Sequence, residues 1–222
     1  TNRLKGNHTV EFLDLNETVL NSISFTVTDI YKYLQPLPVI YNLFIKDNLS
    51  CDKEDLNNNI LIIDCGSFTI DTSLICNMKN KISFSIPIGS NVIYEAIRKE
   101  LLKKDIHLQL KDIEEFHIKE RNFLTRKREV ISISFDYFPK VLLNFADSIQ
   151  SYFDNHYGNS VIDKVYLTGG ASDYFLPVIQ KIFPDINMTA DKFFGNATGM
   201  IKTLNVYSAD TLHRFRFILY SN

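Results

Sequence analysis

The sequence predicts an α/β fold in which a mixed β-sheet is flanked by helices. Two apolar runs, Ile60–Ile63 and Val165–Leu167, have the length and composition of buried strands. A glycine-containing turn follows each run. Toward the C-terminus, strand-like and helix-like segments alternate, which is typical of a sheet covered by helices.

The N-terminal quarter carries the weakest signals. Thr9–Leu13 and Thr18–Val27 alternate between apolar and polar residues, as strands do. Val39–Ile45 follows two prolines and is expected to form a short helix. The stretch Lys46–Asn59 is polar and rich in Asn, so we expect a linker there.

The central segments predict three strands followed by helices. Asn59–Gly89 contains the strands, with Asn77–Asn80 as a hairpin turn because Asn tolerates the left-handed conformation. Ser90 is expected to cap a helix that ends at Lys104. The charged stretch Leu108–Arg128 is expected to be helical, with the basic run Arg121–Arg128 as a solvated face, a mobile loop or a protein-contact surface.

The remaining elements are expected in the second half of the chain. The sequence predicts a long amphipathic helix over Phe135–His156 and a second helix over Tyr174–Phe183. A short strand over Ile186–Thr189 and a helix over Asn196–Leu204 should follow. The tail Leu212–Tyr220 is basic and aromatic, and we expect a packed or frayed terminus there, with a partner-binding segment as the alternative.

The first glycine turn brings together polar groups at the end of a buried strand. Asp64 ends the strand, Gly66 allows a tight bend, and Ser67 and Thr69 supply hydroxyls. Consecutive backbone N–H groups in such a turn form a concavity that suits phosphate. A carboxylate at the strand end can hold a hydrated Mg²⁺ ion. An ordinary hairpin with Gly and Ser in its turn is the alternative.

The second glycine turn lies far downstream and strengthens the phosphate interpretation. Gly169, Gly170 and Ala171 follow a strand and precede a helix. Free N–H groups and the positive end of a helix dipole then lie beside the turn. A lone Gly-Gly pair is weak evidence, but two such turns in one chain predict a shared site.

Composition excludes several classes of function. The 24 basic and 26 acidic residues nearly balance, so no general nucleic-acid or membrane surface is expected. Cys51, Cys65 and Cys76 lack the spacing of a metal site and are expected to be free thiols in a reducing cytoplasm. The sequence shows no transmembrane run or signal peptide, and because it begins with Thr we expect part of a longer protein.

Together the two turns resemble the nucleotide-binding half of the actin-like ATPase superfamily, a ribonuclease-H-like fold. Asp64-x-Gly66-Ser67-x-Thr69-x-Asp71 resembles its second phosphate motif, and Leu167-Thr168-Gly169-Gly170-Ala171 resembles its adenosine motif. ParM-like plasmid-segregation actins are the most similar members. Gln35-Pro36, Ile88-Gly89-Ser90 and the Asn-containing loop of Asp191–Met200 support that similarity.

The resemblance implies a role for each matched residue. Asp64 would hold Mg²⁺ through water, and Asp71 would fix the hairpin. The N–H groups of Gly66, Ser67 and Phe68 and the Thr69 hydroxyl would face the β- and γ-phosphates of ATP or GTP. The second turn, Gly169, Gly170 and Ala171, would bracket the α-phosphate and ribose. The catalytic residue is left unassigned, because no match to the family's N-terminal phosphate loop precedes Asn59.

The resemblance also implies a function and a domain plan. We expect a cytoplasmic, filament-forming protein that segregates plasmids through a DNA-bound adaptor and makes no direct contact with nucleic acid or membrane. A small-molecule kinase and a non-hydrolysing scaffold or adaptor are the alternatives, so ATPase activity stays open. Residues 1–58 would be the tail of a first domain, and residues 59–204 a second, nucleotide-binding domain. A helical insertion is expected near 105–132 and a tail over 205–222.

Overall fold

The chain contains two compact units. The computed structural model describes residues 5–14, 16–27, 36–46, 57–77, 79–118, 123–124, 130–131, 141–192 and 194–208. One unit spans Thr1–Leu34 and the other Gln35–Asn222. The domain plan with a boundary at residue 58 stays a prediction. None of the described helices is long and apolar enough to cross a membrane.

The first unit is an antiparallel hairpin with two different faces. Strand β1 (Gly6–Leu13) pairs with β2 (Val19–Val27), and Val10 lies opposite Ile23. Thr9 and Ser24 share a hydrogen bond of 3.1 Å on the opposite face. Because neighbouring side chains along a strand point to opposite faces, one face of the hairpin is apolar and the other polar.

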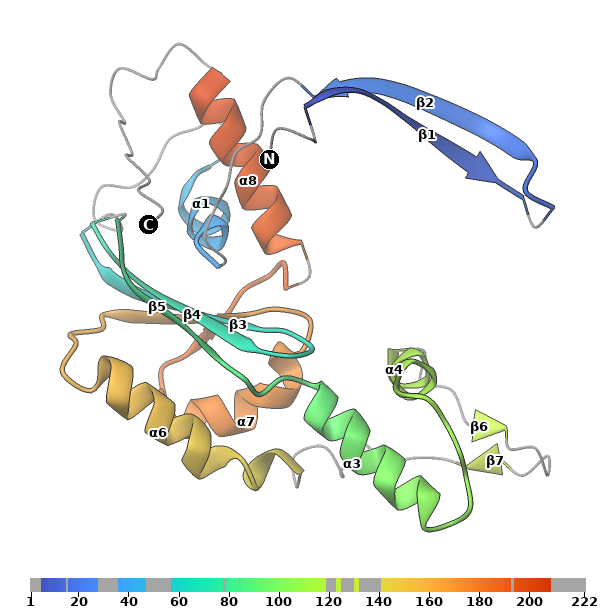
Figure 1. Ribbon diagram of the computed structural model, residues 1–222. Coiled ribbons are helices and arrows are strands. Elements are labelled where there is room, and N and C mark those ends of the chain that lie inside the picture. The colour runs from blue at the N-terminus through green and yellow to red at the C-terminus, as the bar shows by residue number, and fades with distance from the viewer. Residues whose placement is uncertain are drawn as a thin grey trace. The chain divides into compact units, whose positions relative to one another are not determined.

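The second unit is built on one mixed sheet of five strands in the order β5-β4-β3-β8-β9. The central strand β3 pairs antiparallel with β4 and parallel with β8 (Figure 1). This arrangement confirms the predicted fold class. The strands are β3 (Asn59–Cys65), β4 (Ile70–Cys76), β5 (Lys79–Ile86), β8 (Lys164–Thr168) and β9 (Asn187–Met188).

Helices cover both faces of this sheet, which explains why β3 is continuously apolar from Ile60 to Ile63. Leu61 and Ile63 join a core that includes residues of three helices, α3 (Asn91–Leu102), α6 (Ala146–Tyr157) and α7 (Ser172–Ile182). Ile60 and Ile62 face a second core formed with α1 (Pro38–Phe44). Helix α8 (Gly195–Ser208) packs against α1 (Figure 1).

Two predicted helices differ from the structure. The helix expected from Phe135 is interrupted before α6, because the N–H groups of Asn144 and Phe145 bond to carbonyls three residues earlier, at 3.2 and 2.9 Å. Its first residues, 132–140, lie outside the described part of the chain.

The stretch Leu108–Arg128 is helical only in part. Helix α4 (Leu110–Ile118) is followed by the short antiparallel pair β6 (Phe123–Leu124) and β7 (Val130–Ile131). Aromatic and β-branched residues favour strands, which accounts for the change. The tail Leu212–Tyr220 and most of the basic run Arg121–Arg128 lie outside the described residues.

Candidate functional site

The two glycine turns lie at the same edge of the sheet. Strands β3 and β8 run parallel, and Asp64 is the register partner of Thr168. The chain therefore enters both turns side by side at the carboxyl ends of these strands. The Ala171 N–H donates to the Cys65 carbonyl at 3.0 Å and ties the second turn to the first. This confirms that the turns share one edge.

The start of α3 holds the first turn in place. The Ser90 N–H donates to the Gly66 carbonyl at 3.1 Å, and the Asn91 N–H donates to the Ser67 carbonyl at 2.8 Å. A Cβ atom on Gly89 would lie 2.4 Å from the carbonyl carbon and oxygen of Ser67. Only glycine therefore permits this approach between α3 and the turn.

The first turn leaves two backbone donors unused. The Gly66 N–H closes the turn by donating to the Thr69 carbonyl at 2.9 Å. The N–H groups of Ser67 and Phe68 make no hydrogen bond to another described residue. The Phe68 side chain is 75% exposed and so lies away from the core. These two adjacent donors have the character of an anion-binding concavity.

Asp71 holds the hairpin together on the strand opposite Asp64. It is the register partner of Asp64 across β3 and β4. Its Oδ2 accepts from the Thr69 hydroxyl at 3.2 Å, and its Oδ1 accepts from the Ser85 hydroxyl. The expectation that Asp71 fixes the hairpin agrees with these contacts. The Thr69 hydroxyl, expected to face phosphate, donates a hydrogen bond to Asp71 here.

The second turn is built around a close contact with Asp64. Gly169 has a φ of +93°, and a Cβ atom there would lie 2.4 Å from Asp64 Oδ1. The Gly169 N–H donates to the Lys192 carbonyl at 3.1 Å. Gly170 is exposed, and its N–H makes no hydrogen bond to another described residue. Gly170 is thus the member of this turn that offers a backbone donor.

Asp64 is buried between β8 and α8. Its side chain is 6% exposed, and its Oδ2 accepts a hydrogen bond of 2.7 Å from Asn196 Nδ2. The start of α8 is fixed by Asp191, which accepts from the Phe194 N–H at 2.9 Å and from the Thr198 hydroxyl at 3.1 Å. Sequence reasoning assigned no site role to Asn196, although the Asn-Gly loop pattern pointed to this segment.

Buried polar atoms without partners lie beside both turns. Among the described residues, Asn196 Oδ1, next to Asp64, has no hydrogen-bond partner, and neither does Ser172 Oγ, which follows the second turn. Ser172 is fully buried. A buried polar group without a partner is uncommon and is often satisfied by a water or ligand.

Electrostatics at this edge combine positive helix ends with negative carboxylates. Helices α3, α7 and α8 all begin here, and each helix N-terminus carries a partial positive charge. Burial, followed by the charges of Asp64 and Asp71, raises the pKa of the Cys65 thiol well above its usual value. Cys65 is therefore neutral and takes no part as a thiolate.

The described residues include no group of three or more His, Cys, Asp or Glu side chains that could hold a metal ion directly. Mg²⁺ does not require such a group, because it usually keeps several waters and binds one or two protein carboxylates with phosphates. Asp64, beside the unpartnered Asn196 oxygen, fits a hydrated Mg²⁺ ion.

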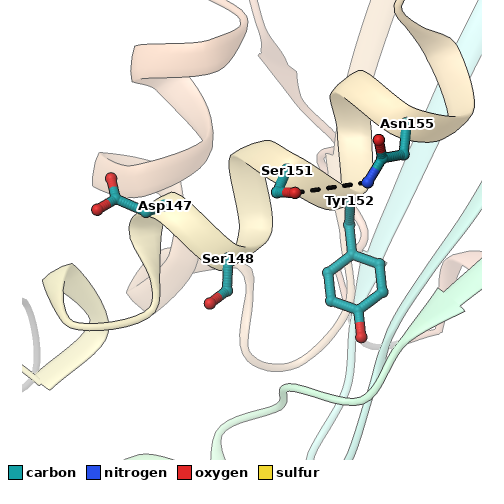
Figure 2. Close-up of a pocket in the computed structure, with 5 residues that line it drawn as sticks. All are labelled: Asp147, Ser148, Ser151, Tyr152 and Asn155. Atoms are coloured by element: carbon teal, nitrogen blue, oxygen red, sulfur yellow. Dashed lines mark hydrogen bonds between the residues drawn. The ribbon is translucent and has the colours of Figure 1, made fainter.

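Two surface hollows lie elsewhere. One, of about 360 Å³, has a lining whose described residues all belong to α6, including Asp147, Ser151 and Tyr152 (Figure 2). The other, of about 450 Å³, lies between α3 and residues 141–145. The described residues that line these two hollows include none from the two glycine turns. Those of the first hollow come from a single helix, α6.

Comparison with known proteins connects this fold to actin homologues. No protein-family model and no curated protein matches the chain. An archaeal actin homolog, Ta0583, aligns over 85% of this chain and 59% of its own, with 17% identity and a TM-score of 0.68. The actin-like protein Alp7A aligns over 96% and 62%, with 15% identity and a TM-score of 0.71.

A ParM filament structure from Clostridium botulinum is also similar. It aligns over 91% of this chain and 61% of its own, with 19% identity and a TM-score of 0.67. The chain therefore has the actin-like fold. It spans about three-fifths of the length of these three structures.

Proposed function

We propose that this chain is the nucleotide-binding part of an actin-like protein that assembles into filaments. One observation carries the proposal: two glycine turns with unused N–H donors flank the buried Asp64 at one sheet edge. Three helix N-termini at that edge favour an anion. One structure of the similar archaeal homolog is a complex with ADP, and a similar ParM is described as a filament.

Each group at the edge has a role in this proposal. The Ser67 and Phe68 N–H groups would bind the β- and γ-phosphates of ATP or GTP, with Gly66 supplying the bend. The Thr69 hydroxyl would join them by turning its O–H from Asp71 to the phosphates. Gly169, Gly170 and Ala171 would border the α-phosphate and ribose, and Gly170 would donate its N–H. Asp64 would hold Mg²⁺ through water, and the ion would neutralise phosphate charge.

The finer role in this proposal is plasmid segregation. The chain would associate with further copies in the cytoplasm, and a DNA-bound adaptor would connect the filament to its cargo. Residues 59–204 would form the nucleotide-binding domain, and residues 1–58 would belong to a neighbouring actin-like domain. Pelleting with ATP, with GTP and without nucleotide tests assembly, and nucleotide binding without turnover would favour a non-hydrolysing scaffold.

The binding site itself is tested by Asp64→Asn. We expect the wild-type melting temperature to rise when Mg²⁺-ADP is added and this rise to be lost in Asp64→Asn, because binding stabilises the folded state by mass action. Asp163→Asn is the matched control. Asp163 accepts from the Asn59 N–H at 2.7 Å at the opposite end of β3, so its loss should lower the melting temperature without changing the rise. A rise that survives in Asp64→Asn would contradict the assignment.

A further inference from the structure

The contact between Asn196 and Asp64 has a definite polarity. The amide nitrogen of Asn196 donates a hydrogen bond of 2.7 Å to Asp64 Oδ2, which is an acceptor. The amide oxygen then points elsewhere, and it is buried without a hydrogen-bond partner in the described part of the chain. The side chain thus donates to the carboxylate and presents an unused acceptor beside it.

This contact restricts the position of Asp64 from two sides. Asn196 donates a hydrogen bond to Asp64 Oδ2. On the other side, Asp64 Oδ1 lies so close to the Gly169 backbone that a Cβ atom on Gly169 would be only 2.4 Å from it. The carboxylate therefore has little room to turn. A carboxylate that holds a metal ion through water benefits from such orientation, because hydrogen-bonded neighbours of metal-binding groups fix their geometry.

The position of Asn196 is itself well supported. It lies in the first turn of α8, whose start is fixed by the contacts of Asp191 with Phe194 and Thr198. Further along α8, Lys202 donates to the Ile45 carbonyl at 2.7 Å, beside the end of α1. Asn196 is thus held by the packing of α8 and is not free to follow Asp64 if that side chain moves.

We propose that Asn196 is a positioning residue for Asp64 and that its Oδ1 accepts a hydrogen bond from a water molecule of the hydrated cation. This inference rests on the proposed function of the site. Mg²⁺ keeps several of its waters when bound to protein, and each water needs acceptors for its hydrogens. An unused buried acceptor next to the carboxylate meets that need.

The test measures the Mg²⁺ concentration at which ADP produces half of its full rise in melting temperature. This concentration is compared between the wild type and two variants of Asn196. Asn196→Ala removes both contacts, and we expect this concentration to increase about tenfold, as for other hydrogen-bonded neighbours of metal-binding groups. Asn196→Asp keeps the shape but replaces the donor by a second negative charge. It should lower the melting temperature without Mg²⁺, and Mg²⁺ should restore it.

Asn155→Asp is the matched control, because Asn155 is exposed on α6 and gains the same charge far along the chain from the site. It should leave the Mg²⁺ requirement unchanged. Mn²⁺ binding, followed by electron paramagnetic resonance in the presence of ADP, gives a second readout that stability alone does not move. Both Asn196 variants should bind Mn²⁺ with altered affinity.

The outcomes separate the two proposals. If Asn196→Ala and Asn196→Asp melt at lower temperature but keep the wild-type Mg²⁺ and Mn²⁺ requirements, Asn196 is only structural and this inference is wrong. The proposed function would still stand if Asp64→Asn loses the nucleotide-dependent rise. If the wild-type chain shows no such rise, the proposed function is wrong and the role of Asn196 is overturned with it.

Discussion

Replacing Gly199 by Ala should separate α8 from α1. A Cβ atom at this position would lie 1.8 Å from the Pro38 carbonyl oxygen and 2.6 Å from its carbonyl carbon. Reaching an ordinary contact of 3.4 Å requires a displacement of about 1.6 Å. Both atoms belong to the backbone, so no side-chain rotation can relieve the clash.

The cost follows from what this displacement breaks. Overpacking at a tight contact costs about 1–3 kcal/mol. Moving α8 would also strain the hydrogen bonds from Lys202 to the Ile45 and Asn42 carbonyls, at 2.7 and 3.3 Å. Because Ala favours a helix over Gly by about 1 kcal/mol, which offsets part of this cost, we expect a net loss of roughly 1–2 kcal/mol in the free energy of unfolding.

Urea denaturation followed by far-UV circular dichroism measures this loss, with Gly195→Ala as the control. Gly195 is buried in the same helix, but its Cβ atom would meet its nearest neighbour, Thr168 Oγ1, at 3.7 Å. That is ordinary contact, so the control should lose no stability and should gain up to about 1 kcal/mol from the higher helix propensity of Ala. Equal midpoints for the two variants would refute the inferred contact between α1 and α8.

Two further predictions concern the first turn and the core. Gly89→Ala should lower stability and abolish the Mg²⁺-ADP-dependent rise in melting temperature, because its Cβ atom would lie 2.4 Å from the Ser67 backbone; an unchanged rise would show that the turn does not bind nucleotide. Burial raises the pKa of Tyr157 to about 12, partly offset by its hydrogen bond to Thr72. A raised folded-state pKa means that stability present below about pH 10 is lost as the pH rises toward 12. Melting temperatures across this range should fall less steeply in Tyr157→Phe than in the wild type, and parallel curves would contradict the assignment.

Local patterns were sufficient to predict the sheet and both turns. The continuous apolar run of β3 is confirmed as a strand covered on both faces, with Leu61 and Ile62 in different cores. Gly66 and Gly169 marked the turns because the chain must bend sharply where a strand ends. Such signals depend only on neighbouring residues, so they can be read without knowledge of the fold.

Contacts between distant segments could not be predicted in this way. Asn196 and Asp64 are 132 residues apart, and only the packing of α8 brings them together. The need for glycine at position 89 could not be predicted either, because the close approach of Gly89 to Ser67 depends on how α3 packs against the turn. The interruption before α6 was also missed, because the apolar periodicity continues through Phe145 while the backbone turns.

The two carboxylates at the sheet edge differ in what surrounds them. Asp64 and Asp71 lie directly opposite each other across β3 and β4, an arrangement that is unfavourable for like charges. Hydroxyl donors from Thr69 and Ser85 engage both oxygens of Asp71, so hydrogen bonds within the hairpin stabilise this carboxylate. Asp64 has an amide donor on one oxygen and the Gly169 backbone against the other.

This difference decides which carboxylate suits a cation. A cation that displaced the hydroxyls from Asp71 would have to break the contacts that close the hairpin. At Asp64 the neighbouring Asn196 oxygen is unused, and the unused N–H groups of Ser67 and Phe68 belong to the turn that follows. A hydrated Mg²⁺ ion beside Asp64 would reduce the repulsion between the carboxylates and balance the charge of a phosphate on that turn. The geometry therefore favours Asp64 for the metal and Asp71 for the fold.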